Sequence, residues 1–187
     1  MLACCAPRRT LVAALACLML AAAYAQVAQA LSLTLADGRK VDYTLRTFPP
    51  DASAIASGTK LAPTNAFDAA RLLISRLARG RIEDAALLSN APKQRYRLLH
   101  EAYAGWNPED FVRAYGRYFV PPNRIVAEAS IGEHHLVLWK LQDIDYLAGY
   151  FFMDIDGKTY LDDWPSPARA ELEQVLEAYR SGKLPLP

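Results

Sequence analysis

The chain has 187 residues, 52% of them hydrophobic, and a formal net charge of +1 at pH 7. This near-neutral balance gives no reason to expect nucleic acid or an anionic lipid surface as the partner. All three cysteines, Cys4, Cys5 and Cys17, lie near the N-terminus. Removal of that segment leaves a chain without thiols, which excludes disulfides, thiolate metal sites and cysteine nucleophiles.

The N-terminus has the pattern of an export signal. Arg8 and Arg9 supply a positive start, and the apolar run that follows is too short to span a bilayer comfortably. Small residues suited to cleavage end at Ala25 and at Ala30. We expect residues 1–30 to be a signal peptide and the protein to be periplasmic or secreted; an uncleaved segment would instead anchor it to the membrane. Without the two arginines, the formal net charge of +1 becomes −1.

Residues 31–48 have the pattern of a β-hairpin. Leucines alternate with small or polar residues before Asp37-Gly38, a two-residue turn signal whose central positions need positive φ. Apolar residues alternate again after the turn. The segment 49–63 is rich in proline, alanine and serine, which predicts a linker to an α+β domain over residues 64–187.

Helix start and stop signals follow the linker. Asn65 and Asn107 are typical helix caps, and a proline follows the second of them. Gly80 and Gly105 are typical stops, so this stretch predicts four helical segments. Four alternating segments then predict an antiparallel meander, and a Ser-Pro pair begins a last helix. The expected fold class is α+β: an N-terminal β-hairpin, helices packed on a curved four-stranded antiparallel meander, and a C-terminal helix.

The meander, residues 123–164, has two tight connections that determine its pairing. An Asp-Gly turn makes Tyr150 face Asp163, and a four-residue loop earlier in the chain makes Val137 face Tyr150. Because side chains alternate across a sheet, this pairing sorts them into two faces. One face carries His135, Val137, Trp139, Tyr150, Phe152, Leu161 and Asp163, and the other carries His134, Leu136, Leu138, Phe151, Met153, Tyr160 and Trp164. Both faces are apolar, so the hairpin, the last helix or another copy of the chain must cover the second.

The first of these faces carries the candidate ligand site, because it places a carboxylate, a phenol and an imidazole among apolar neighbours. The candidate residues are Tyr150, Asp163, His135, Trp139 and Phe152. A neutral Asp163 beside Tyr150 would donate hydrogen bonds into an apolar pocket, or the pair would be purely structural. His135 lies ~11 Å from Asp163 by strand spacing, which is too far for a hydrogen-bonded dyad.

No metal or cofactor is expected. The adjacent His134 and His135 point to opposite faces of a strand, so one ion cannot bind both. Neither a zinc-binding HExxH spacing nor a phosphate-binding loop is present in the sequence. Aromatic residues between Tyr96 and Phe119 would either floor an apolar ligand pocket or pack against the sheet.

Helices followed by a strongly curved meander of long strands are similar to the nuclear transport factor two-like superfamily, the cone-shaped α+β proteins that include the ketosteroid isomerases. The residues behind this resemblance lie in the helix from Asn65 to Gly80 and in the strands around Trp139, Tyr150 and Phe152. The resemblance implies a cone that binds a small apolar ligand, association through the sheet, or catalysis of isomerisation or hydrolysis. The family's catalytic acid pair has no matching position here, so the resemblance implies no catalytic residue, and a shared fold does not establish a shared function.

These observations favour an exported non-catalytic module that binds a small apolar ligand or a protein partner. One alternative is a small cofactor-free isomerase or hydrolase, in which Asp163 or His135 is the acid or base and Tyr150 polarises a substrate carbonyl. Another is a homodimeric or envelope-complex accessory subunit. Its contact face would carry Leu136, Phe151 and Trp164.

Overall fold

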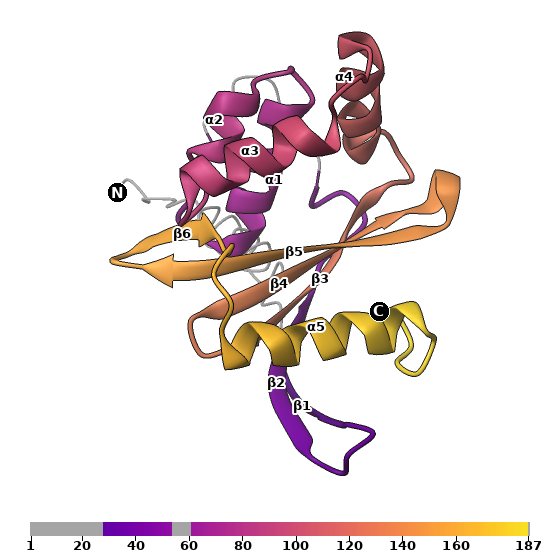
Figure 1. Ribbon diagram of the computed structural model, residues 1–187. Helices are drawn as coiled ribbons and strands as arrows, with labels where there is room; N and C mark the ends of the chain where they lie inside the picture. Colours follow the sequence, from indigo (N-terminus) through magenta and orange to yellow (C-terminus); the bar gives the residue numbers. More distant parts are fainter. Residues whose placement is uncertain (1–27, 54–60, 187) are drawn as a thin grey trace, which may run out of the picture.

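The computed structural model describes residues 28–53 and 61–186; most of the predicted signal peptide, residues 1–27, lies outside this description. The fold is α+β, with one six-stranded antiparallel sheet between two helical layers (Figure 1). The strands follow chain order: β1 (Gln29–Thr34), β2 (Lys40–Thr47), β3 (Arg124–Ile131), β4 (His134–Leu141), β5 (Tyr146–Ile155) and β6 (Lys158–Leu161). The helices are α1 (Ala66–Leu77), α2 (Ile82–Ala86), α3 (Pro92–Ala102), α4 (Pro108–Gly116) and α5 (Pro167–Arg180), with short 3-10 helices η1 (Arg117–Phe119) and η2 (Gln142–Ile144).

The sheet has six strands, not the predicted four, because the N-terminal hairpin is part of it. The C-terminal half of β2 pairs with β3 over Thr44–Thr47 and Ala127–Ser130. The chain after β2 stays on the sheet, since Ile125 N donates to Ser53 Oγ at 2.6 Å. The remainder of the predicted linker includes residues 54–60, which lie outside the described residues. Alternation predicts a strand, but it does not indicate a pairing partner that comes only after four helices.

The meander has the register that its tight connections predict. Val137 pairs with Tyr150 across β4 and β5, and Phe152 pairs with Leu161 across β5 and β6. The Asp-Gly turn between β5 and β6 has positive φ at both residues. The two faces of the sheet are therefore sorted as the sequence predicts.

One irregularity in β3 changes which face its side chains occupy. A β-bulge between Ile125 and Ala127 inserts Val126 as an extra residue against β4. Ile125 consequently packs with the helices α1–α4, whereas Val126 and Ala127 pack with α5. The alternation of apolar residues in this stretch does not indicate the bulge.

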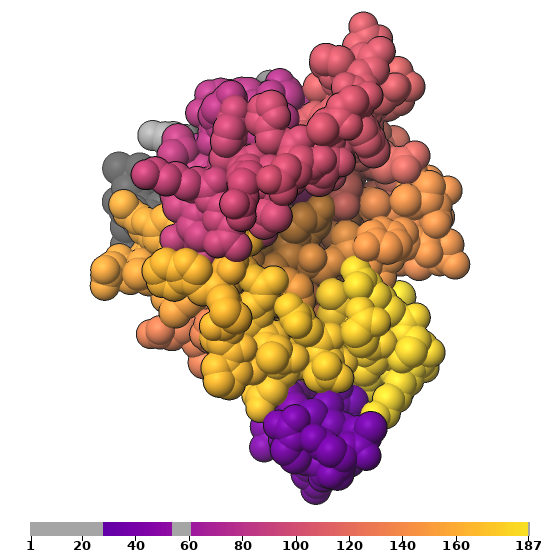
Figure 2. Space-filling model, in the orientation of Figure 1, coloured from indigo at the N-terminus to yellow at the C-terminus, as the bar shows by residue number. Residues whose placement is uncertain are grey.

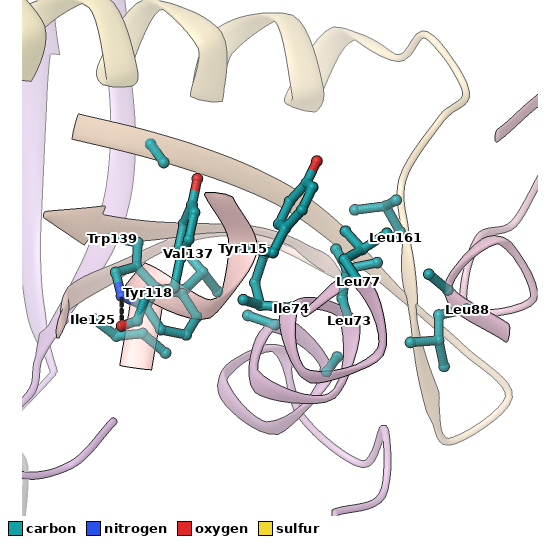
Figure 3. Packing of buried hydrophobic residues seen from close by; sticks show 14 of the residues in the cluster. Leu73, Ile74, Leu77, Leu88, Tyr115, Tyr118, Ile125, Val137, Trp139 and Leu161 are labelled. Atoms are coloured by element: carbon teal, nitrogen blue, oxygen red, sulfur yellow. Dashed lines mark hydrogen bonds between the residues drawn. The ribbon is translucent and has the colours of Figure 1, made fainter. Parts of the chain in front are cut away.

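Helices α1–α4 cover one face of the sheet (Figure 1). Their buried layer includes Ile74 of α1 together with Trp139 and Phe152 of the sheet, all fully buried. Trp139 Nε1 donates to the backbone oxygen of Tyr118 at 3.1 Å, so its polar group is satisfied (Figure 3). Burial of each such large side chain contributes about 1.5–3 kcal/mol to stability.

Helix α5 covers the second face. Its buried layer includes Leu172 and Val175 of α5 and Leu136 of β4, and the hairpin adds Leu33 and Val41. The sequence offers three elements to cover this face: the hairpin, the last helix and another copy of the chain. In the structure, the last helix packs across the face, and the hairpin adds apolar side chains to the same buried layer. Within residues 28–53 and 61–186, no helix has the length and apolarity that a membrane crossing needs.

Helices α1, α4 and α5 begin at the predicted capping residues, whereas α2 and α3 begin without a side-chain cap. The side chains of Asn65, Asn107 and Ser166 accept hydrogen bonds from backbone N–H groups in the first turns of α1, α4 and α5. Each cap satisfies a donor that has no partner within the helix and contributes about 1 kcal/mol. Local sequence signals therefore set where the helical layers begin.

Candidate ligand-binding site

Strand β5 extends well beyond its neighbour β6. The pairing covers only Phe152–Ile155, and one further bond joins Asp162 N to Phe151 O at 2.8 Å. From Tyr146 to Tyr150, β5 has β4 on one side and, among the described residues, no strand on the other. This edge lies between α5 and the helices α1–α4, and the surface is hollowed there between the yellow and the magenta helices (Figure 2).

A cavity of about 260 Å³ opens beside this edge. Leu73 and Leu77 of α1 and Leu99 of α3 form its apolar wall. Leu73 and Leu77 lie one helical turn apart, so α1 presents both to the same side. Tyr115 of α4 and Tyr150 of β5 add two phenol rings to the lining. Leu161 of β6 and Arg169 of α5 complete the lining, so four helices and two strands contribute to one recess with both apolar and polar walls.

Tyrosine hydroxyls supply the polar groups of the helix side. Tyr103 and Tyr115 share a hydrogen bond of 2.5 Å, and Tyr150 donates to Tyr118 at 2.8 Å. The rings of Tyr115 and Tyr118 are stacked and direct their hydroxyls the same way (Figure 3). Burial raises the pKa of Tyr115, Tyr118 and Tyr150, so all three are neutral phenols at physiological pH. Each hydroxyl pair has two hydrogens and uses one between its members. In the Tyr150–Tyr118 pair the remaining hydrogen is on Tyr118, which is not among the residues that line the cavity, whereas in the other pair it can be on Tyr115, which does line it.

The charged groups at the rim are paired with one another. Arg95 of α3 binds both carboxylate oxygens of Asp163, with Nε 2.9 Å from Oδ2. Ser89 Oγ donates to the same carboxylate at 2.5 Å. Arg169 of α5 lines the other side of the cavity and donates to the backbone oxygen of Asp162. Both arginines are therefore held in place by the chain segment that follows β6.

Of the five residues predicted to bind a ligand, Tyr150 lines the cavity. Trp139 and Phe152 belong to the same helix-side layer, as predicted, but both are fully buried beneath the helices. Asp163 lies beyond the end of β6, and its carboxylate bonds Arg95 where the sequence predicted a contact with Tyr150. The role of these residues in ligand binding stays a prediction.

The fifth residue, His135, belongs to a separate polar cluster on the sheet. Its Nδ1 lies 3.1 Å from Glu128 Oε1, and its Nε2 lies 3.1 Å from Asp154 Oδ2. Burial alone would lower the pKa of His135, but the hydrogen bond and charge of Glu128, with those of Asp154, outweigh burial and raise it. Burial would likewise raise the pKa of Glu128, but His135 and Arg46 outweigh it and hold that pKa below its usual value.

The adjacent histidines have different partners. Unlike His135, His134 bonds Asp162, with Nδ1 3.0 Å from Oδ2. This separation follows from the alternation of side chains along a strand. Over the part of the chain that the structure describes, no group of three or more His, Cys, Asp and Glu side chains is placed to hold a metal ion.

Sequence reasoning missed most of the cavity wall. Leu73 and Leu77 fit an apolar helical stripe, but such a stripe has the same pattern whether it packs or lines a pocket. Tyr115 is one of the aromatic residues predicted either to floor a pocket or to pack on the sheet, and it does both. Nothing in the local sequence marks Arg95 as the partner of Asp163, because the two are far apart in the chain.

Comparisons with models of known protein families, with curated proteins and with solved structures found no match to this chain. The case for a function therefore depends on the geometry of the cavity, of the free strand edge and of the groups around them.

Proposed function

We propose that the protein is an exported, non-catalytic binding module that holds an apolar ligand, or an apolar group of a protein partner, in the cavity beside β5. The observation that carries this proposal is a recess of about 260 Å³ in which leucine side chains lie beside two tyrosines, two arginines and an aspartate. Ligand pockets generally combine apolar walls with placed polar groups that orient the ligand. The volume lies just below the roughly 300–1,000 Å³ of pockets for drug-sized molecules, so we expect a smaller ligand or a single side chain.

The polar groups indicate which ligand chemistry the cavity favours. Either hydroxyl of the Tyr103–Tyr115 pair can be the donor within it, so a neutral Tyr115 can donate a hydrogen bond to an oxygen or nitrogen acceptor. Tyr150 already donates to Tyr118 and offers a ligand only an acceptor. Arg95 is already neutralised by Asp163, so it offers no uncompensated charge to a ligand. We therefore expect an uncharged group with one acceptor atom at the helix side. The resemblance to nuclear transport factor two-like proteins points to the same kind of ligand.

Filling the cavity tests the proposal. L99W places a bulky side chain in the recess, and L98W is the matched control, because Leu98 is the exposed neighbour on the same helix. The probe is N-phenyl-1-naphthylamine, an uncharged apolar dye that fluoresces when bound. We expect the wild-type protein and L98W to bind it and L99W to bind at least about tenfold more weakly. Native mass spectrometry of protein from its own compartment should show a retained ligand in the same two proteins. Equal binding by all three would refute the proposal.

No observation favours the catalytic alternative. Its three groups have separate partners: Asp163 bonds Arg95, Tyr150 bonds Tyr118, and His135 bonds Glu128. The accessory-subunit alternative has little surface to use, because α5 covers the sheet face intended for contact. Leu136 on that face is fully buried, while Trp164, at 53% exposure, stays open.

A further inference from the structure

We propose that the group held in the cavity is a side chain of an extended peptide segment from another protein, and that this segment joins the sheet as an added strand on the free edge of β5. The inference rests on the proposed function and names its partner. In strand addition, backbone hydrogen bonds provide affinity, and pockets for alternate side chains provide selectivity. Here the free edge of β5 offers the backbone hydrogen-bonding groups, and the cavity directly beside it offers a pocket for a side chain.

The backbone of Gly149 supplies the unpaired groups. In an antiparallel strand, the N–H and C=O of one residue point to the same side, and successive residues alternate. Phe151 O accepts from Asp162 N on the β6 side, so Gly149, two residues earlier, directs its N–H and C=O there as well. The β5–β6 register would place Trp164 opposite Gly149, but Trp164 N donates to the Asp162 carboxylate at 3.3 Å. No other described residue bonds the Gly149 backbone from that side.

This edge lacks the usual protection. Proteins block free strand edges with charges, prolines, bulges or a covering element. The stretch 147–149 contains no charged residue and no proline. At Leu147 the edge is partly blocked, because the backbone oxygen of Leu147 accepts from Arg180 Nε at 3.1 Å. Gly149 is partly exposed, and the space that its side chain would take is filled by Leu176 of α5 on the face of the sheet, not at its edge.

The position of the edge favours a single strand over a second copy of this chain. Strand β5 lies at the floor between α5 and the helices α1–α4 (Figures 1 and 2). An added strand lies only about 4.8 Å from its neighbour, so one extended segment can occupy this floor. A second copy would bring its own helical layers against those beside β5.

The cavity and its rim indicate what the segment carries. Side chains of an added strand alternate, so one that points to the helix side enters the recess beside Leu99 and Tyr115. A volume of about 260 Å³ suits one large aliphatic or aromatic side chain. At the rim, Arg95 is paired with Asp163 and Arg169 with Glu173, so the rim charges are already compensated and the segment needs no charged residue there.

Amide hydrogen exchange in the wild-type protein tests the edge without any ligand. The N–H groups of Ala148 and Tyr150 point toward β4 and should exchange slowly, whereas that of Gly149 should exchange at least about tenfold faster. If the Gly149 amide is as protected as those of its two neighbours, the edge is already occupied and the inference fails.

Peptide selection then tests the partner. Random peptides of about nine residues, displayed on phage, are selected against the wild-type protein and counter-selected against L99W. The expected sequences contain a large apolar residue at a fixed position, and the synthetic peptides should slow Gly149 exchange at least about tenfold. Methylation of a peptide nitrogen that faces β5 should abolish binding, while methylation of the next nitrogen should not. Recovery of no discriminating peptide, or of peptides that leave Gly149 exchange unchanged, would overturn the inference.

The dye experiment separates this inference from the proposed function. If N-phenyl-1-naphthylamine binds the wild-type protein and L98W but not L99W, while no peptide protects Gly149, the cavity binds small molecules and the peptide inference alone fails. If neither dye nor peptide binds, both proposals fail. Because L99W can also disturb folding, L77F provides a second filled variant, and the exchange measurement uses no variant at all.

Discussion

Replacement of Gly149 with alanine tests how closely α5 packs on β5. The φ of Gly149 lies outside the left-handed region, so alanine can adopt the same backbone conformation. A Cβ atom at this position would lie 2.5 Å from Leu176 Cδ2 and 3.0 Å from Leu136 Cδ1. Both leucines are buried, so they cannot move away without disturbing their neighbours in the core. The methyl group of alanine therefore overpacks this contact.

Two opposing effects set the size of the change. Overpacking of a core contact costs about 1–3 kcal/mol, whereas alanine in a strand is about 0.5–1 kcal/mol more favourable than glycine. G149A should therefore lower the free energy of unfolding by up to about 2.5 kcal/mol. L176A alone should cost about 2–5 kcal/mol, but it removes the atoms nearest to the new Cβ. In the L176A background, G149A should instead stabilise by about 0.5–1 kcal/mol, which is a reversal of sign.

Urea unfolding of the wild-type protein, G149A, L176A and the double variant measures the four free energies that this cycle needs. Gly116, at the end of α4, is the matched control, because a Cβ there would meet nothing within 4 Å. We expect G116A to stabilise by about 0.5–1 kcal/mol. Equal destabilisation by G149A with and without Leu176 would refute the reasoning, because Leu176 would then not be the obstacle.

Two further predictions concern the His135 cluster and the N-terminus. The pKa of His135 is raised above the ordinary 6.5, so its contribution to stability is complete below that pH and is lost as pH rises through the folded value. Urea unfolding between roughly pH 6 and pH 9 should show a steeper loss for the wild-type protein than for H135Q, and parallel curves would contradict this. The pKa of Glu128 is lowered from 4.5, so its contribution is present above that pH and is lost as pH falls through the folded value. Strand β1 begins at Gln29, so signal cleavage after Ala30 would remove two of its pairs with β2, whereas cleavage after Ala25 keeps them. If the proposed signal is cleaved, intact-mass spectrometry of the mature protein should give a chain that starts directly after Ala25; a chain that starts directly after Ala30 would show that these pairs are dispensable.

The parts of the fold that the sequence predicts well depend on short-range signals. An Asp-Gly pair needs positive φ at both residues, and it has that conformation between β5 and β6. Once this turn is placed, alternation determines the pairing of Phe152 with Leu161 and hence the face of every side chain in these strands. The caps at Asn65 and Asn107 are equally local, since each satisfies an N–H two or three residues away.

The parts that sequence reasoning missed depend on partners far apart in the chain. Strand β2 pairs with β3 only after the chain has formed four helices, so the hairpin was predicted as a separate element. The candidate site has the same difficulty. The register correctly places Tyr150 and Phe152 on the helix side, but burial depends on what the helices cover. Phe152 is fully buried beneath the helices, whereas Tyr150 lines the cavity. The alternation of side chains along the strand cannot predict this difference.

The early end of β6 explains why the cavity and the free edge occur together. Asn90 donates from Nδ2 to the Asp162 carboxylate at 2.9 Å, and its Oδ1 accepts from Asp163 N at 2.9 Å. Arg95, in the first turn of α3, binds the Asp163 carboxylate. These contacts draw the chain toward α3 and away from β5, so Gly149 loses the neighbour that a longer β6 would supply. Asn90 and Arg95 therefore act as positioning residues for the chain that follows β6, because their contacts end the strand where the edge of β5 becomes free.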